Sequence, residues 1–157
     1  MTKKNIRALV ICAIAVLASI ASEVYLRAQM GVGEWVRTDK DAPPGMTMTV
    51  EACCGSGRRL TYHVPLRGGE MLMTVDSAFD GADAAVLFGG KPSGETMAIK
   101  RVDPLHLTAV VKMNGQQFGT YKATLSADGK TLTVEGDYTA SVGGQPAGKQ
   151  TEVWVRK

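Results

Sequence analysis

Turn-forming sequences recur along this chain at intervals of about 8–12 residues, and this spacing limits what it can fold into. These sequences are Pro43-Pro44-Gly45, Gly55-Ser56-Gly57, Gly68-Gly69, Asp80-Gly81, Gly89-Gly90, Asn114-Gly115, Asp128-Gly129 and Gly143-Gly144. Between them apolar and polar side chains alternate, and no window after residue 30 shows the 3.6-residue apolar period of a helix. The pattern predicts short antiparallel strands.

The alternating segments define ten candidate strands. They are 33–38, 46–52, 58–65, 69–75, 84–88, 95–102, 105–113, 117–126, 130–140 and 148–156. Strands with one apolar face must bury that face and protect their edges, and closure into a barrel does both. We therefore predict an all-β domain over residues 33–157, an antiparallel up-and-down β-barrel of eight to ten strands. A two-sheet sandwich is the alternative.

Side-chain pairing specifies the register of two hairpins. Across the loop 53–57, Met48 lies opposite Tyr62 and Val50 opposite Leu60 on a wholly apolar face. A two-residue type I′ turn at Asp128-Gly129 separates the faces equally well. Its pairs are Leu125 with Leu132, Ala123 with Val134, Thr124 with Thr133 and Lys122 with Glu135. A slip of one residue would mix the faces, so both registers are well determined.

The Asn114-Gly115 turn requires an extra residue. A strict two-residue loop would place Thr108 opposite Tyr121 and turn Leu107 outward. One added residue places Ala109 opposite Tyr121 instead, so we predict a three-residue loop over 114–116 with a bulge.

The first 21 residues have the composition of an export signal. Lys3, Lys4 and Arg7 precede the apolar stretch 8–22, which is shorter than the roughly 20 residues that span a bilayer. Ser19-Ile20-Ala21 fits a cleavage site before Ser22. We predict a signal peptide at 1–21, a linker at 22–32, and a periplasmic or extracellular protein. The alternative is an uncleaved signal helix that anchors the protein to the membrane.

Charge and motifs exclude several function classes. The chain has 18 basic and 15 acidic residues, and its excess of three lies in the first seven positions. The remainder is neutral and lacks the basic stripe that nucleic-acid binding requires. No metalloprotease, nucleophile-elbow, phosphate-loop or Cys-x-x-Cys motif is present. We expect neither an enzyme, a cofactor nor a metal.

Both ends of the barrel sequence carry a family pattern. Gly33-Glu34-Trp35 opens the first strand, and Val153-Trp154-Val155-Arg156 ends the last. This layout resembles the lipocalins, and segments 94–103 and 126–134 look like small secreted bacterial lipocalin-like proteins. The resemblance implies a calycin-type barrel whose floor is closed by Trp35, with Arg156 stacked across the indole. The chain lacks the mid-chain Thr-Asp-Tyr signature and a C-terminal helix.

The inward faces of the predicted strands define a candidate ligand wall. Its members are Met48, Val50, Leu60, Tyr62, Met71, Met73, Met97, Ile99, Leu107, Ala109 and Tyr121. Methionines make an adaptable apolar surface, and small barrels can hold one ligand. The first hypothesis is therefore a binding protein for a small apolar molecule. The second is a filled barrel that serves as a structural or protein-interaction domain of the cell envelope.

A third hypothesis concerns the adjacent cysteines Cys53 and Cys54. The hairpin register places both in a loop near water, where a vicinal disulfide, two thiols and bridges to another molecule are alternative states. A thiol- or copper-handling loop at the barrel mouth is the functional interpretation. The simpler one is two small residues tolerated in a turn.

Overall fold

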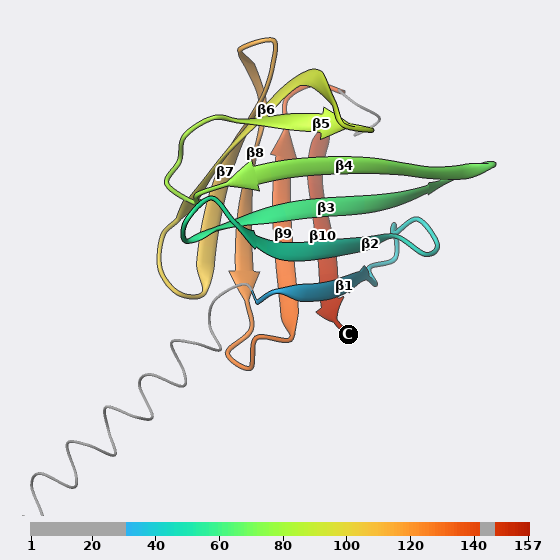
Figure 1. The fold of residues 1–157 in the computed structure, drawn as a ribbon, viewed down its shortest axis with the longest axis vertical. Helices are drawn as coiled ribbons and strands as arrows, with labels where there is room; N and C mark the ends of the chain where they lie inside the picture. The colour runs from blue at the N-terminus through green and yellow to red at the C-terminus, as the bar shows by residue number, and fades with distance from the viewer. Residues whose placement is uncertain (1–30, 142–146) are drawn as a thin grey trace, which may run out of the picture.

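The structure is a computed structural model that describes residues 31–141 and 147–157, and over these residues it is entirely β (Figure 1). The strands are β1 (Gly33–Arg37), β2 (Thr47–Cys53), β3 (Gly57–Leu66), β4 (Gly69–Ser77), β5 (Ala84–Phe88), β6 (Lys91–Arg101), β7 (His106–Met113), β8 (Gln116–Leu125), β9 (Thr131–Tyr138) and β10 (Gly148–Arg156). Each predicted strand is present, with bounds shifted by at most a few residues.

The ten strands form one closed antiparallel barrel. Each strand pairs with the next in sequence, and β1 pairs with β10 through Trp35↔Arg156 and Val36↔Val155. In Figure 1 the first strand, in blue, lies beside the last, in red. The predicted up-and-down barrel is confirmed, and the sandwich alternative is wrong. Closure pairs every strand edge of the sheet.

The two predicted hairpin registers are confirmed. Met48 lies opposite Tyr62 and Val50 opposite Leu60. In the β8–β9 hairpin, Leu125 lies opposite Leu132. The turn of this second hairpin differs from the prediction: Gly129 has a positive φ and Asp128 does not, so the turn is not type I′.

The β7–β8 hairpin has the predicted register but a different loop. Ala109 lies opposite Tyr121, as expected. The loop itself has only two residues, Asn114 and Gly115, and both have positive φ. The extra residue lies instead in a bulge at Phe118, opposite the Val111–Lys112 step. Phe118 is buried, so the bulge turns an aromatic ring inward.

The barrel has two different ends. We call the end formed by loops 38–46, 67–68, 89–90 and 114–115 the mouth. The opposite end, formed by loops 54–56, 78–83, 102–105 and 126–130, is the floor.

The most buried large side chains of the core are Trp35, Trp154, Met48, Val50, Val75, Val86 and Val111. They are inward-facing residues of the strands, as the two-residue period requires.

Within the described residues, no helix is long and apolar enough to span a membrane. The predicted signal peptide at 1–21 and most of the linker at 22–32 lie outside the described residues.

Candidate functional site

A large cavity occupies the mouth half of the barrel. Its volume is about 1020 Å³, and a second cavity of about 110 Å³ shares Met46, Met73, Met97 and Tyr121 with it. The larger cavity reaches the surface beside the exposed Lys40 in loop 38–46. Ligand cavities commonly measure about 300–1,000 Å³, so this space suffices for a small molecule.

Most of the predicted wall residues line these cavities. Nine of the eleven do so: Leu60, Tyr62, Met71, Met73, Met97, Ile99, Leu107, Ala109 and Tyr121. The structure places the other two, Met48 and Val50, in the packed core near the floor, where they are 1% and 0% exposed. Both face inward as predicted, but the interior is filled at their level.

A buried ion-pair network lies between the cavity and the β1–β10 seam. The Arg37 guanidinium lies 2.8 Å from an Asp39 carboxylate oxygen and 3.2 Å from one of Glu152. Asp39 also accepts a hydrogen bond from the Val153 amide at 3.1 Å, and Glu152 accepts one from the Trp154 indole at 3.0 Å. These contacts tie loop 38–46 and the inward face of β10 together at the barrel closure.

Burial acts to raise the pKa of both carboxylates in this network, but their net pKa shifts have opposite directions. Burial acts to raise the pKa of Asp39, but hydrogen bonds from Arg37 and Val153 outweigh it, and the pKa lies below its usual value. For Glu152 burial dominates, and its pKa is raised despite the charge of Arg37 and the hydrogen bond from Trp154. Asp39 is therefore the better satisfied anion.

Two aromatic residues of the cavity wall, Phe118 and Tyr121, both pack against Tyr138. The Tyr138 hydroxyl donates a hydrogen bond to the Tyr121 hydroxyl, and their rings meet edge to face with centroids 5.4 Å apart. Phe118 stacks on Tyr138 at 6.2 Å. A Cβ on Gly119 or Gly136 would lie 2.9 Å from the Tyr138 ring, so these glycines let the ring approach the backbone. Burial raises the pKa of Tyr138 to about 12, so its hydroxyl stays neutral.

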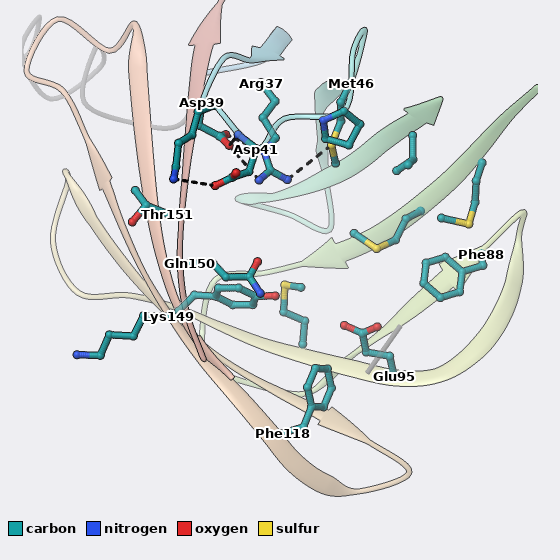
Figure 2. Close-up of a pocket in the computed structure, with 17 residues that line it drawn as sticks. Arg37, Asp39, Asp41, Met46, Phe88, Glu95, Phe118, Lys149, Gln150 and Thr151 are labelled. Carbon is teal, nitrogen blue, oxygen red and sulfur yellow. Dashed lines mark hydrogen bonds and ion pairs between the residues drawn. The ribbon is translucent and has the colours of Figure 1, made fainter. Parts of the chain in front are cut away.

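Glu95 is the most unusual residue of the cavity wall. It belongs to β6, is 9% exposed, and its carboxyl has no hydrogen-bond or ion-pair partner among the described residues. Figure 2 shows this carboxyl turned into the cavity, whereas Lys149 points away from it. Burial raises the pKa of Glu95, because removal from bulk water disfavours the charged form of a carboxyl.

Sequence reasoning missed Arg37, Glu152 and Glu95 as interior residues, although a signal was present. Glu95 is in phase with Met97 and Ile99, which were assigned to the wall. Arg37 and Glu152 are likewise in phase with Trp35 and Trp154. A period of two therefore places all three charged side chains inside the barrel.

At the floor, Trp35 is 0% exposed and Arg156 is its cross-strand neighbour. Arg156 shares the inward face of β10 with Trp154, and its guanidinium donates a hydrogen bond to the Val32 carbonyl at 2.7 Å. The guanidinium lies against the backbone of residues 31–33. Among the described residues no cation–π contact joins Arg156 to Trp35, so the stacking implied by the resemblance is wrong: the guanidinium binds the backbone instead. The cation–π contact at this end joins Arg101 to Phe79, 5.2 Å from the ring centroid.

Cys53 and Cys54 form a vicinal disulfide where β2 meets the β2–β3 loop. Cys53 is the last residue of β2 and pairs with Gly57, so the expectation that both cysteines lie in the loop is wrong for Cys53. This loop belongs to the floor, so the expectation of a redox-sensitive loop at the mouth is wrong about the end of the barrel. The three groups Cys53, Cys54 and Asp76 place one potential ligand atom each within 4.8 Å of one another. In the disulfide the sulfurs are no longer thiolates, and Asp76 accepts two hydrogen bonds from Arg59, each at 2.7 Å.

Comparisons with protein-family models, with curated proteins and with solved structures yield no match to this chain. The closed ten-stranded antiparallel barrel is compatible with a calycin-like fold.

Proposed function

We propose that this protein binds a small, largely apolar molecule inside its barrel. The observation that supports this most is the cavity of about 1020 Å³, which reaches the surface at the mouth. Methionine and aromatic side chains make up seven of its 17 lining residues and eight are charged or polar, so the wall offers an adaptable apolar surface together with polar groups that can orient a ligand. Under the alternative of a filled structural barrel, side chains would occupy this space.

The lipocalin-like pattern agrees with this proposal. Trp35 is buried at the floor beside Arg156, and the large cavity lies at the opposite end, in the mouth half of the barrel. We propose a lipocalin-like binding role on this arrangement together with the sequence motifs. Fold alone does not establish function, so the cavity and its residues support the proposal more strongly than the barrel does.

We also propose that the protein works outside the cytosol, in the periplasm or beyond the cell. The basic, then apolar sequence of residues 1–21 supports export, and the Cys53–Cys54 disulfide suits an oxidising compartment. N-terminal sequencing of the exported protein is expected to find Ser22 first. An intact Met1 in that sample would favour the membrane-anchored alternative.

The binding proposal is tested with a neutral apolar fluorophore, N-phenyl-1-naphthylamine. We expect its fluorescence to rise on titration into the protein, and Met73→Arg to abolish the rise because Met73 lines both cavities. Leu72→Arg is the matched control, since the neighbouring Leu72 is an outward residue of β4 and 38% exposed. Circular dichroism checks folding, and Val64→Arg, nearer the mouth, serves if Met73→Arg does not fold.

Equal binding to the wild type and to a folded cavity variant would place the probe on the outer surface. A complete lack of binding would contradict the proposal. Native mass spectrometry of the protein purified from its own host adds an independent readout, because a retained small molecule increases the measured mass.

A further inference from the structure

We propose that the molecule bound in the cavity carries a cationic or amine group, and that Glu95 is its counter-ion. This inference rests on the proposed binding function and specifies the ligand class: an apolar body with one basic nitrogen.

The first observation is the isolation of the Glu95 carboxyl. Glu95 belongs to the cavity wall and is only 9% exposed. None of the described side chains forms a hydrogen bond or an ion pair with its carboxyl. Buried carboxyls in proteins are ordinarily hydrogen-bonded or ion-paired, because an unpaired charge out of water is costly. A partner that enters the cavity would supply the missing contact, and Figure 2 shows the carboxyl facing that space.

The second observation is the balance of buried charge around the cavity. Apart from Tyr62, Tyr121 and Tyr138, whose raised pKa values keep their hydroxyls neutral, the buried ionisable groups described on this side are the guanidinium of Arg37 and the carboxyls of Asp39, Glu152 and Glu95. Arg37 is held by Asp39 and Glu152, so it has no further charge to offer Glu95. Lys40 is exposed, and Lys149 is exposed and turned away, so neither replaces the missing cation. One cation therefore faces three carboxyls, and a positively charged ligand group restores the balance.

The third observation is the kind of surface that shares the cavity with Glu95. Phe88, Phe118 and Tyr121 line the same space, together with the thioether of Met97. Aromatic faces attract cations electrostatically, more strongly where water is excluded, and methionine adapts to varied apolar shapes. A carboxyl among aromatic rings suits an apolar amine better than it suits a fatty acid, whose carboxylate Glu95 would repel.

The test compares three ten-carbon probes that differ only in their head group: decylamine, decanol and decanoate. Each displaces N-phenyl-1-naphthylamine from the protein at neutral pH, where the amine is protonated. We expect decylamine to bind about tenfold or more tightly than decanol, and decanoate to bind most weakly. In Glu95→Gln the advantage of the amine is expected to disappear, while decanol binding stays unchanged. Glu135→Gln, an exposed carboxyl of β9, is the matched control and should keep the wild-type order.

The outcomes separate this inference from the function on which it rests. If decanol binds as well as decylamine, or if Glu95→Gln keeps the amine preference, the cavity binds apolar molecules but Glu95 is not the counter-ion. If none of the probes binds and the fluorophore does not bind either, both proposals are overturned. Glu95→Met repeats the measurement with a side chain of similar length should Glu95→Gln not fold.

Discussion

Arg37 and Glu152 form an ion pair inside the barrel, with 3.2 Å between the guanidinium Nη1 and the carboxylate Oε1. The two residues lie on the first and the last strand, whose pairing closes the sheet. Their side chains are 8% and 15% exposed, and Asp39 holds the other side of the guanidinium. The closure of this barrel is thus reinforced by buried charge as well as by backbone hydrogen bonds.

Replacing Arg37 with Met should destabilise the protein by about 3–5 kcal/mol, because two buried carboxylates would lose their counter-ion. The midpoint of urea denaturation measures the loss. Arg59→Met is the control. Arg59 pairs with Asp76 on the outer surface, where both side chains are more than 40% exposed, so its loss should lower the stability far less than the loss of Arg37. Equal losses for the two variants would contradict a special role for the interior pair.

Glu95→Gln should stabilise the ligand-free protein at neutral pH and leave its stability nearly unchanged at acidic pH. Burial raises the pKa of Glu95 in the folded state, so the folded state binds the proton more tightly than the unfolded state. The wild type therefore loses stability as the pH rises from the unfolded pKa through the raised folded pKa, and the uncharged Gln does not. Denaturation midpoints of both proteins at about pH 4 and about pH 7 test this. If the difference in midpoint between the wild type and Glu95→Gln is the same at both pH values, Glu95 is not a buried titrating group.

Trp35→Ala should lower the free energy of unfolding by about 3–5 kcal/mol, since the indole is fully buried at the floor. Trp35→Phe should cost distinctly less, because the indole N–H has no hydrogen-bond partner among the described residues and the substitution removes only volume. Chemical denaturation of both variants measures the two losses. A Phe variant as unstable as the Ala variant would mean that the N–H is in fact paired.

Reduction of the purified protein should increase its mass by about 2 Da, one hydrogen for each of Cys53 and Cys54. Replacing both with Ser should leave the fold intact and change stability by less than about 1 kcal/mol, because a bond between neighbours closes almost no chain loop. Mass spectrometry and a denaturation curve give the two readouts. If the double variant does not fold, the disulfide has a structural role at the floor that its position in a turn does not explain.

The sequence by itself determined where the strands lie and the register of three hairpins, β2–β3, β7–β8 and β8–β9. These properties are local: alternation sets the buried face of each strand, and pairs such as Val50 with Leu60 can be matched across a single turn. The same local rule would also have placed Glu95, Arg37 and Glu152 inside the barrel had their phase been followed from Met97, Trp35 and Trp154.

Only the tertiary structure decided what the inward side chains do there. Whether the interior is filled depends on the summed volumes of side chains from all ten strands, and no single hairpin reports that sum. The Arg37–Glu152 pair exists because barrel closure brings the two ends of the sheet together. The isolation of Glu95 is equally a long-range property: a carboxyl lacks a partner only with respect to every segment folded around it, and local sequence does not contain that information.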